Sequence, residues 1–473
     1  MNKQLLKLGS LVFTVVLLGS LSSCKEDEPP LPDNLAAFEV ASLGLADGES
    51  EAEVKINLTR AVSSTTTVQI SYTENGIVYG EDYTTTPAAA SGTLSVTIPA
   101  NATTASFKVI VGDDVFLDGG ETIVYTIASI ESTTGVLIGE TNELTFSFSA
   151  IVSEGSQLTL QGLAGAESGA SAANSVFVNF RSNNQASVLR ASWDLGFYSG
   201  ADFRVILNNT TSAGAKVTTE TDLASIGAAD TVGLTLAVSQ GAPAPEHFAF
   251  FDALNGSLSG TVIPAISATA SDNKVIIINR GAGGTPARPW IKARITRNAS
   301  GGYTVQYGTI QQTSGFTSVD IPKDAAYNFK HLSFNGGTIV NVEPKKAEWD
   351  ILWSYSQYQT TFSGNLVPYN FSDIVAINIH GGVKAAEVLT STVEYAAYNE
   401  SNIASTTFLA ERYVIGHNWR ATTGTIGVYG DRFYVVQDAS GNVYKLKFIS
   451  FHPNEGGTRG RPVIEYKLVK AAG

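Results

Sequence analysis

The sequence predicts an all-β protein with more than one domain. Thr, Ser, Val, Ile, Tyr and Gly recur along the chain of 473 residues, and these residue types favour strands and turns. Apolar and polar residues alternate with a period of two in many short segments, which is the spacing of a strand with one buried face. Long stretches with helical periodicity are absent from the sequence. We therefore expect an N-terminal β-sandwich followed by two tandem β-rich units.

The first residues have the pattern of a bacterial lipoprotein signal. Lys3 and Lys7 precede an apolar stretch that has the length of a signal peptide and is short for a membrane span. The stretch ends in Leu-Ser-Ser-Cys at 21–24, where small residues give a lipoprotein signal peptidase access to the bond before the cysteine. We expect residues 1–23 to be removed and Cys24 to be acylated. The alternative is an ordinary secretory signal that contains a cysteine.

Residues 24–35 are expected to form an acidic, Pro-rich tether. Lys-Glu-Asp-Glu follows the cysteine at 25–28, and prolines stiffen the segment after it. Such a charged run resembles the signal that sends lipoproteins of Bacteroidetes-type outer membranes to the cell surface; the alternative is a solvated tether. The expected location is therefore the outer membrane, with the protein held by its lipid and facing the exterior. Because Cys24 is the single cysteine, a disulfide within one chain is excluded.

Charge and motifs exclude several classes of function. The net charge of −13 and the pI near 4.9 give a surface that repels nucleic acid. The sequence contains no His-Glu-x-x-His, Cys-x-x-Cys or Gly-x-Ser-x-Gly motif and no phosphate-binding Gly-rich loop. We therefore expect no nucleic-acid partner and no enzymatic activity.

Residues 36–149 are expected to form the β-sandwich. Period-two alternation occurs in short segments that Gly, Asp and Asn clusters separate, which is typical of a sandwich of short strands. These segments are 54–58, 67–72, 105–111, 122–127 and 144–148.

This unit resembles the Calx-β domain family. The resemblance lies in Gly-Glu-Asp-Tyr at 80–83, Ile-Pro-Ala-Asn-Ala at 98–102 and Val-Ile-Val-Gly-Asp-Asp at 109–114. Some members bind Ca²⁺ through acidic loops at one end of the sandwich, since this cation prefers clustered oxygen ligands. The positions that match are Asp82, Asp113, Asp114 and Glu121. Because Asp-Gly-Gly at 118–120 replaces a denser acidic run, the alternative is a structural sandwich with solvated acids.

The rest of the chain contains a duplication, with copies expected at 157–313 and 314–470. Each copy has an Asn-Phe pair, at 179–180 and 328–329, followed by a Trp-Asp pair. Later apolar strands and a closing lysine follow in the same order and at nearly the same spacing. We expect each tryptophan to face the core from a strand, and each aspartate to contact a turn or the backbone.

The duplicated segments resemble the HmuY family of bacterial surface lipoproteins. The motifs are Trp-Asp-Leu-Gly-Phe at 193–197, Trp-Asp-Ile-Leu-Trp at 349–353, Asp-Arg-Phe-Tyr-Val-Val at 431–436 and Gly-Asn-Val-Tyr-Lys-Leu-Lys-Phe at 441–448. The resemblance covers about 157–470. It implies capture of haem, from solution or from haemoproteins, and transfer to an outer-membrane receptor. It also implies axial ligation of the iron by two histidines, or by methionines in some relatives.

Methionine ligation is excluded, because Met1 is the single methionine and leaves with the signal peptide. His380 and His417 both lie in the interval of the second copy where the family carries its ligands. Trp419 and Arg420 follow closely and could meet a porphyrin face and a propionate. The alternative for each histidine is a polar turn residue, since their positions do not match the family's ligand motifs residue by residue.

Two functions of different class remain open. The first is capture of haem or a related tetrapyrrole at the cell surface. The second is a non-enzymatic structural or adhesive role, with a glycan or a protein as the partner. A third outcome is an apolar ligand bound without axial iron ligation.

Overall fold

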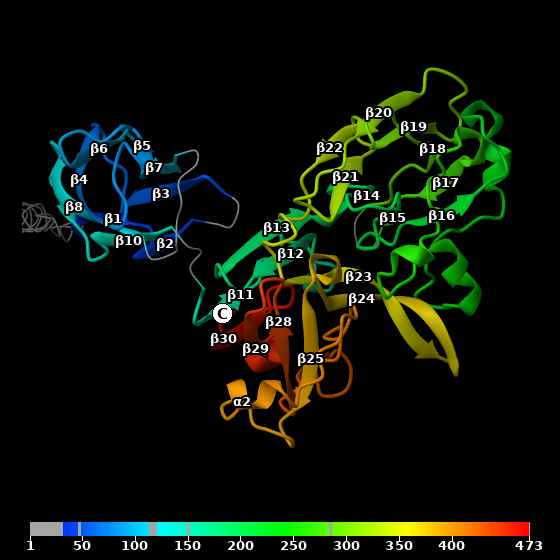
Figure 1. Ribbon diagram of the computed structural model, residues 1–473. Helices are drawn as coiled ribbons and strands as arrows, with labels where there is room; N and C mark the ends of the chain where they lie inside the picture. The colour runs from blue at the N-terminus through cyan, green and yellow to red at the C-terminus, as the bar shows by residue number, and fades with distance from the viewer. Residues whose placement is uncertain (1–31, 46–48, 113–120, 149–151, 283–285, 473) are drawn as a thin grey trace, which may run out of the picture. The chain divides into compact units, whose positions relative to one another are not determined.

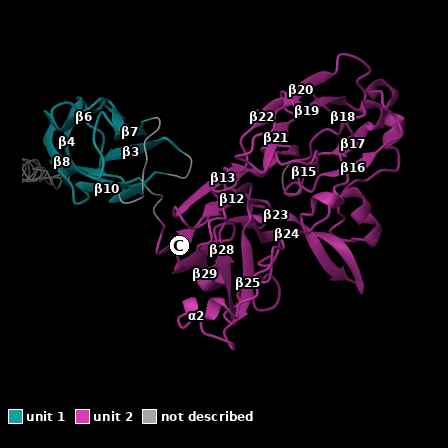
Figure 2. Cartoon of the chain, in the orientation of Figure 1, with its two compact units in different colours: residues 1–151 teal, residues 152–473 magenta. Residues whose placement is uncertain are grey.

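The structure is a computed structural model that describes residues 32–45, 49–112, 121–148, 152–282 and 286–472. The chain divides into two compact units, 1–151 and 152–473 (Figure 2). Strands β1 to β30 make up most of the regular structure, which confirms the all-β prediction. In the part of the chain that the structure describes, no helix combines the length and the apolar character needed to cross a membrane.

The first unit is a β-sandwich, as the alternation predicts. One sheet has the strand order β5-β7-β3-β1-β9 and the other has the order β2-β10-β8-β4-β6 (Figure 1). Buried and exposed residues alternate strictly along β6, and the buried residues of both sheets form one core. The strands are β1 (Asn34–Phe38), β2 (Ser42–Gly44), β3 (Glu51–Leu58), β4 (Thr66–Asn75), β5 (Tyr83–Thr86), β6 (Thr93–Ile98), β7 (Thr104–Val111), β8 (Thr122–Glu131), β9 (Val136–Ile138) and β10 (Glu143–Ser147).

Within its described residues, the second unit contains four larger sheets and one small one. The strand orders are β11-β30-β29-β28-β25, β13-β12-β23-β24, β15-β14-β21-β22, β16-β17-β18-β19-β20 and β26-β27. The strands are β11 (Gly155–Thr159), β12 (Asn174–Asn179), β13 (Asn184–Leu189), β14 (Leu195–Tyr198), β15 (Val205–Leu207), β16 (Gly214–Val217), β17 (Ile276–Asn279), β18 (Ile291–Arg297), β19 (Tyr303–Thr309), β20 (Thr317–Ile321), β21 (Phe329–Ser333), β22 (Thr338–Val340), β23 (Ile351–Phe362), β24 (Asn365–Ile377), β25 (Lys384–Leu389), β26 (Arg420–Ala421), β27 (Gly427–Val428), β28 (Arg432–Gln437), β29 (Val443–Ser450) and β30 (Val463–Lys470).

The two sequence copies exchange their first hairpins. The hairpin β12–β13 of the first copy pairs through β12 with β23, which belongs to the second copy. The hairpin β21–β22 of the second copy pairs through β21 with β14, which belongs to the first. The boundary expected at 313/314 falls between β19 and β20, which pair within one sheet. Strand pairing therefore links the two copies instead of separating them.

Each Trp-Asp pair fixes the hairpin that arrives from the other copy. The Asp350 carboxylate accepts a hydrogen bond from the Phe180 backbone N–H at 2.7 Å, and the Asp194 carboxylate accepts one from the Phe334 N–H at 2.7 Å. The aspartates thus make the backbone contact that the sequence predicts. These hydrogen bonds also correct the Asn-Phe match of the sequence comparison, because the counterpart of Phe180 is Phe334 and not Phe329.

Each tryptophan packs in a different cluster from the residue two positions after it. Trp193 is buried in a cluster with Phe177 and Trp349, whereas Leu195 and Phe197 are buried in a separate core. The reason is local: β14 begins only at Leu195, after a 3₁₀ turn at Arg190–Ser192. Both tryptophans are therefore free to pack where the copies meet.

Candidate functional site

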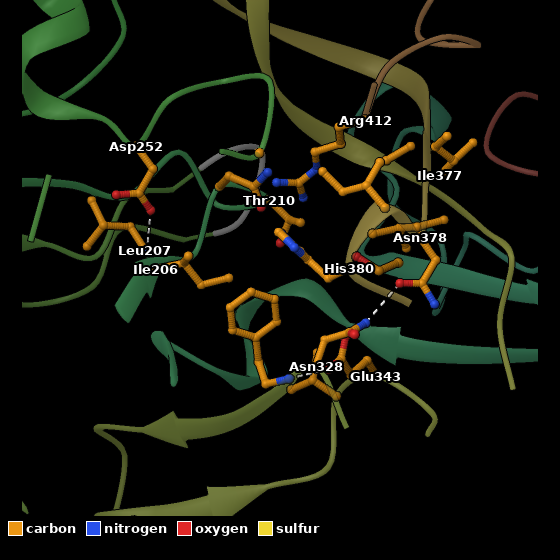
Figure 3. A pocket seen from close by; sticks show the side chains of 18 of the residues that line it. Ile206, Leu207, Thr210, Asp252, Asn328, Glu343, Ile377, Asn378, His380 and Arg412 are labelled. Carbon is orange, nitrogen blue, oxygen red and sulfur yellow. Dashed lines mark hydrogen bonds between the residues drawn. The ribbon is translucent and has the colours of Figure 1, made fainter. Parts of the chain in front are cut away.

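A cavity of about 90 Å³ lies where the two sequence copies meet. Its lining includes Phe177 and Trp193 of the first copy and His331, Trp349 and His380 of the second. Buried apolar side chains of both copies pack around it. We call it the inter-copy cavity, and Figure 3 shows part of its wall.

Equivalent residues of the two copies line the cavity wall, but they differ in chemical type. The Trp193 ring packs edge-on against His331 at 4.7 Å, and the Trp349 ring packs edge-on against Phe177 at 5.1 Å. Phe177 and His331 lie at equivalent positions in the two copies. Each directly precedes a residue whose backbone carbonyl accepts a hydrogen bond from the N–H of the aspartate in the other copy's Trp-Asp pair. The second copy therefore places an imidazole where the first places a phenyl ring.

His331 is a buried imidazole without a hydrogen-bond partner among the described residues. It lies on β21 and is 5% exposed. Burial, together with the neighbouring charge of Lys330, lowers the pKa of His331 to about 3. The ring is therefore neutral at physiological pH and keeps one nitrogen lone pair available.

His380 is the second imidazole of the cavity. It lies in a 3₁₀ turn at Ile379–Gly381, directly after β24, and its ring contacts Phe329 at 5.5 Å. Burial, with the charge of Arg412 as the second cause, lowers the pKa of His380 to about 4. In each copy, the side chain of one asparagine donates a hydrogen bond to the carbonyl of the Trp-Asp tryptophan. His380 lies two residues after this asparagine in the second copy, and Thr210 lies two residues after it in the first, so the two are counterparts.

Two carboxyl groups also line the cavity, and each accepts hydrogen bonds from backbone amides. Asp252 accepts hydrogen bonds from the N–H groups of Leu207 at 2.7 Å and Val262 at 2.9 Å. Glu343 accepts one from the Phe329 N–H at 2.6 Å. Burial raises the pKa of Asp252 to about 6 and that of Glu343 to about 8. Glu343 is therefore mostly neutral at pH 7.

Arg412 supplies the cation of the cavity. Figure 3 shows its side chain directed into the same space as that of His380. No ion pair joins Arg412 to any residue that the structure describes, and its guanidinium lies 5.4 Å from the centre of the Tyr413 ring. Its charge acts to lower the pKa values of Asp252 and Glu343, but among the described residues no carboxylate forms an ion pair with it.

Two more donors of the lining have no partner. The Trp349 Nε1–H and the Gln357 Nε2 amide are buried, and neither has a hydrogen bond within the described ranges. Their side chains are 8% and 2% exposed. Buried polar groups in folded proteins are nearly always hydrogen-bonded, so these donors indicate a missing acceptor.

His417, the other predicted haem ligand, lies elsewhere. It does not line the inter-copy cavity, and its ring stacks on Phe371 at 4.4 Å with an angle of 4°. Burial, with the charge of Arg420 as the second cause, lowers the pKa of His417. The structure thus places His380 and His417 in different surroundings, with no shared ring contact.

Trp419 and Arg420 stabilise the second unit. Trp419 is fully buried, stacks on Phe448 at 4.1 Å and donates its indole N–H to the Asp373 carbonyl at 3.0 Å. Arg420 is buried and donates to the carbonyls of Ser372 and His417. Neither residue lines the inter-copy cavity.

The residues that resemble a calcium site are only partly described. Asp82 accepts a hydrogen bond from the Val78 N–H at 2.9 Å, so it caps its own turn, and Glu121 is buried. Asp113 and Asp114 lie outside the described residues. Among the residues that are described, no group of three or more His, Cys, Asp or Glu side chains is arranged around a metal position.

The sequence reasoning missed His331 and Arg412. It searched for ligands between the Trp-Asp strand and the closing strands, whereas His331 precedes the second Trp-Asp pair. The exchanged hairpin brings His331 to the cavity, and exchange has no local sequence signal. Alignment of the two sequence copies could have found His331, because the correct alignment matches it with Phe177.

Comparisons with known proteins identify the second unit. A family model described as HmuY protein matches residues 171–466. Among solved structures, the apo form of the Calx CBD1 domain aligns at 17% identity, over 25% of this chain and 97% of that one, with a TM-score of 0.21. A two-domain protein of unknown function from Bacteroides fragilis aligns at 12% identity, over 66% of this chain and 92% of that one, with a TM-score of 0.19.

A Bacteroides ovatus protein described as a candidate carbohydrate-binding protein aligns at 11% identity, over 73% of this chain and 98% of that one, with a TM-score of 0.17. Structural likeness at these levels gives no information on function. No curated protein matches the sequence.

Proposed function

The chain belongs to the HmuY protein family, and on that premise we propose that it captures a ligand in the inter-copy cavity, with haem or a related tetrapyrrole as the ligand. In this proposal Cys24 anchors the protein in the outer membrane, facing outward. Haem arrives free or from haemoproteins and passes to an outer-membrane receptor. The protein has no enzymatic role.

One observation carries the proposal: two neutral imidazoles, His331 and His380, line the same aromatic cavity. Haem iron is held by ligands such as imidazole in a largely apolar surrounding. Low pKa values keep both rings in the form that can coordinate iron at physiological pH. We therefore propose His331 as the partner of His380, in place of the pair His380 and His417 that the sequence suggested.

The size of the cavity sets a condition on this proposal. Its volume of about 90 Å³ lies below the roughly 300–1,000 Å³ of pockets that hold drug-sized ligands. A porphyrin therefore requires the walls to move apart. Because the walls come from both copies, haem binding should change how the two copies pack.

The experiment is an absorbance titration of residues 25–473 with haemin, in the oxidised and reduced states. We expect a saturable Soret band at one haem per chain, lost in the His331→Ala and His380→Ala variants. His417→Ala is the matched control and should keep the band. Loss of the band in His380→Ala and His417→Ala, with the band kept in His331→Ala, would restore the pair His380 and His417 and reject His331. Thermal unfolding of each variant separates a lost ligand from a lost fold.

A structural or adhesive surface protein that binds a glycan or a protein is the second candidate. Two observations favour it: the small cavity, and the exposed apolar side chains of Phe362 (40%) and Leu366 (51%) at the end of the β23–β24 hairpin. A titration with no band beyond that of free haemin would reject haem capture and leave this candidate.

A further inference from the structure

We propose that the inter-copy cavity recognises a carboxylate group and that Arg412 is the residue that binds it. The inference rests on ligand capture in this cavity, as proposed above, and it specifies the chemistry of the ligand. It does not depend on iron.

Arg412 is a cation without an ion pair among the described residues, and it lines the cavity. A guanidinium presents a planar fork of donors that matches the two oxygens of a carboxylate. An arginine held at a cavity wall without an acidic partner is therefore suited to an acid that arrives with a ligand.

The acids near Arg412 already accept hydrogen bonds from backbone amides. The oxygens of Asp252 accept two backbone hydrogen bonds, and an oxygen of Glu343 accepts a third. Glu343 is also mostly neutral at pH 7, because burial raises its pKa to about 8. These groups therefore leave the guanidinium fork open.

Among its described residues, the cavity wall has more unpartnered hydrogen-bond donors than unpartnered acceptors. The buried lining atoms without a partner are donors, namely the Trp349 Nε1–H and the Gln357 Nε2 amide. Apart from the free ring nitrogen of His331, no unpartnered buried acceptor belongs to the described lining residues. A ligand that satisfies this wall must supply acceptors, and a carboxylate supplies two oxygens with four lone-pair positions.

The rest of the wall determines the body of the ligand. The rings of Trp193, Phe177 and Phe329 line the same cavity and offer apolar contact. The ligand class is therefore a small amphipathic carboxylic acid, or the carboxylate arm of a larger molecule such as a porphyrin propionate.

The test measures binding of butyrate and benzoate to residues 25–473 by titration calorimetry, each beside its neutral amide. We expect each acid to bind more tightly than its amide. Arg412→Gln should weaken the acids about 10- to 100-fold and leave the amides nearly unchanged. Arg412→Lys should give an intermediate loss, because it keeps the charge without the fork. Arg432→Gln is the control, since Arg432 pairs with Asp431 and Glu387 and does not line the cavity.

Comparison of haemin with its dimethyl ester separates the two sources of the carboxylate. A preference for haemin that Arg412→Gln abolishes assigns the site to a propionate. Binding of butyrate or benzoate without binding of haemin keeps the carboxylate site and rejects haem capture. Equal binding of haemin and its ester, with no effect of Arg412→Gln on the small acids, overturns the carboxylate site and leaves haem capture intact. Absence of butyrate and benzoate binding in the unaltered protein also overturns it.

Discussion

Asp194 and Asp350 accept equivalent backbone hydrogen bonds in the two copies, yet only Asp194 has ion-pair partners among the described residues. The Asp194 carboxylate binds Arg280 at 2.7 Å and Arg288 at 2.9 Å. Asp350 has no ion pair within the described chain; burial, with Asp438 as a further cause, raises its pKa to about 7, although the charge of Arg181 acts in the opposite direction. The same fold position thus holds an ion-paired carboxylate in one copy and, in the other, a carboxyl group without an ion pair among the described residues.

This difference predicts unequal effects of the same substitution. Asp194→Asn leaves Arg280 and Arg288 buried without their counter-charge, so the free energy of unfolding should fall by about 3–5 kcal/mol. Asp350→Asn keeps an acceptor for the Phe180 N–H and removes no ion pair, so the loss should be about 1 kcal/mol. Urea unfolding at pH 7 measures both. Equal losses would contradict the assignment of the arginines to Asp194.

Two buried acids, Glu343 in the cavity wall and Asp350 outside it, predict that stability falls between pH 6.5 and 8. Glu343 and Asp350 have folded pKa values of about 8 and 7, above their unfolded values, so the folded state holds more protons and loses stability as pH rises. His331 and His380 have lowered pKa values, so their contribution is lost only as pH falls below about 6.5.

Glu343→Gln should therefore flatten the decline, by at most about 1.4 kcal/mol per pH unit. Urea midpoints at pH 6.5, 7.25 and 8 provide the measurement. An identical decline in the variant would show that Glu343 is already ionised at pH 6.5.

Trp419 is predicted to matter for stability and not for ligand binding. Trp419→Ala removes a buried ring that stacks on Phe448, so unfolding should become easier by about 3–5 kcal/mol. Trp419→Phe keeps most of the ring contact and should leave haemin binding unchanged. Loss of haemin binding in a folded Trp419→Phe variant would show that Trp419 contributes to the ligand site.

Calcium is predicted to act on the first unit if the acidic positions of its loops bind the ion. Millimolar Ca²⁺ should then raise the unfolding temperature of that unit, and removal with a chelator should reverse the rise. Asp82→Ala should lower stability by about 1 kcal/mol without calcium, since it removes the cap on the Val78 N–H. No calcium-dependent shift in the unaltered protein would reduce Asp82 to this turn-capping role.

Lipid anchoring is predicted to depend on Cys24 alone. Cys24→Ser removes the acylation site, so the protein should move from the membrane fraction to the soluble fraction. Protease treatment of intact cells should degrade the anchored protein if it faces outward. A Cys24→Ser variant that stays with the membrane would indicate attachment by another means.

The strands of the first unit were predictable because their information is local. The alternation along Thr93–Ile98 and Thr104–Val111 states which residues are buried, and short turns set the spacing. The duplication was also readable, because Trp193 and Trp349 begin similar patterns.

The exchange of hairpins was not predictable. From the sequence, β12 could pair with either β14 or β23, since both follow a Trp-Asp pair and have similar apolar patterns. Which strand β12 pairs with depends on contacts between residues far apart in the sequence, so no local sequence pattern indicates it. His331 was overlooked for the same reason, because its place in the cavity depends on which copy its hairpin packs against and not on the neighbouring sequence.

The exchanged hairpins have a consequence for how such a chain can be divided or can have arisen. A fragment that ends at residue 313 contains β12 but lacks β23, and it contains β14 but lacks β21. Neither half therefore carries the partners its own strands require. A single-copy precursor could satisfy the same pairings only as two chains swapping their hairpins, so the present unit has the connectivity of a domain-swapped dimer whose subunits have been fused into one polypeptide.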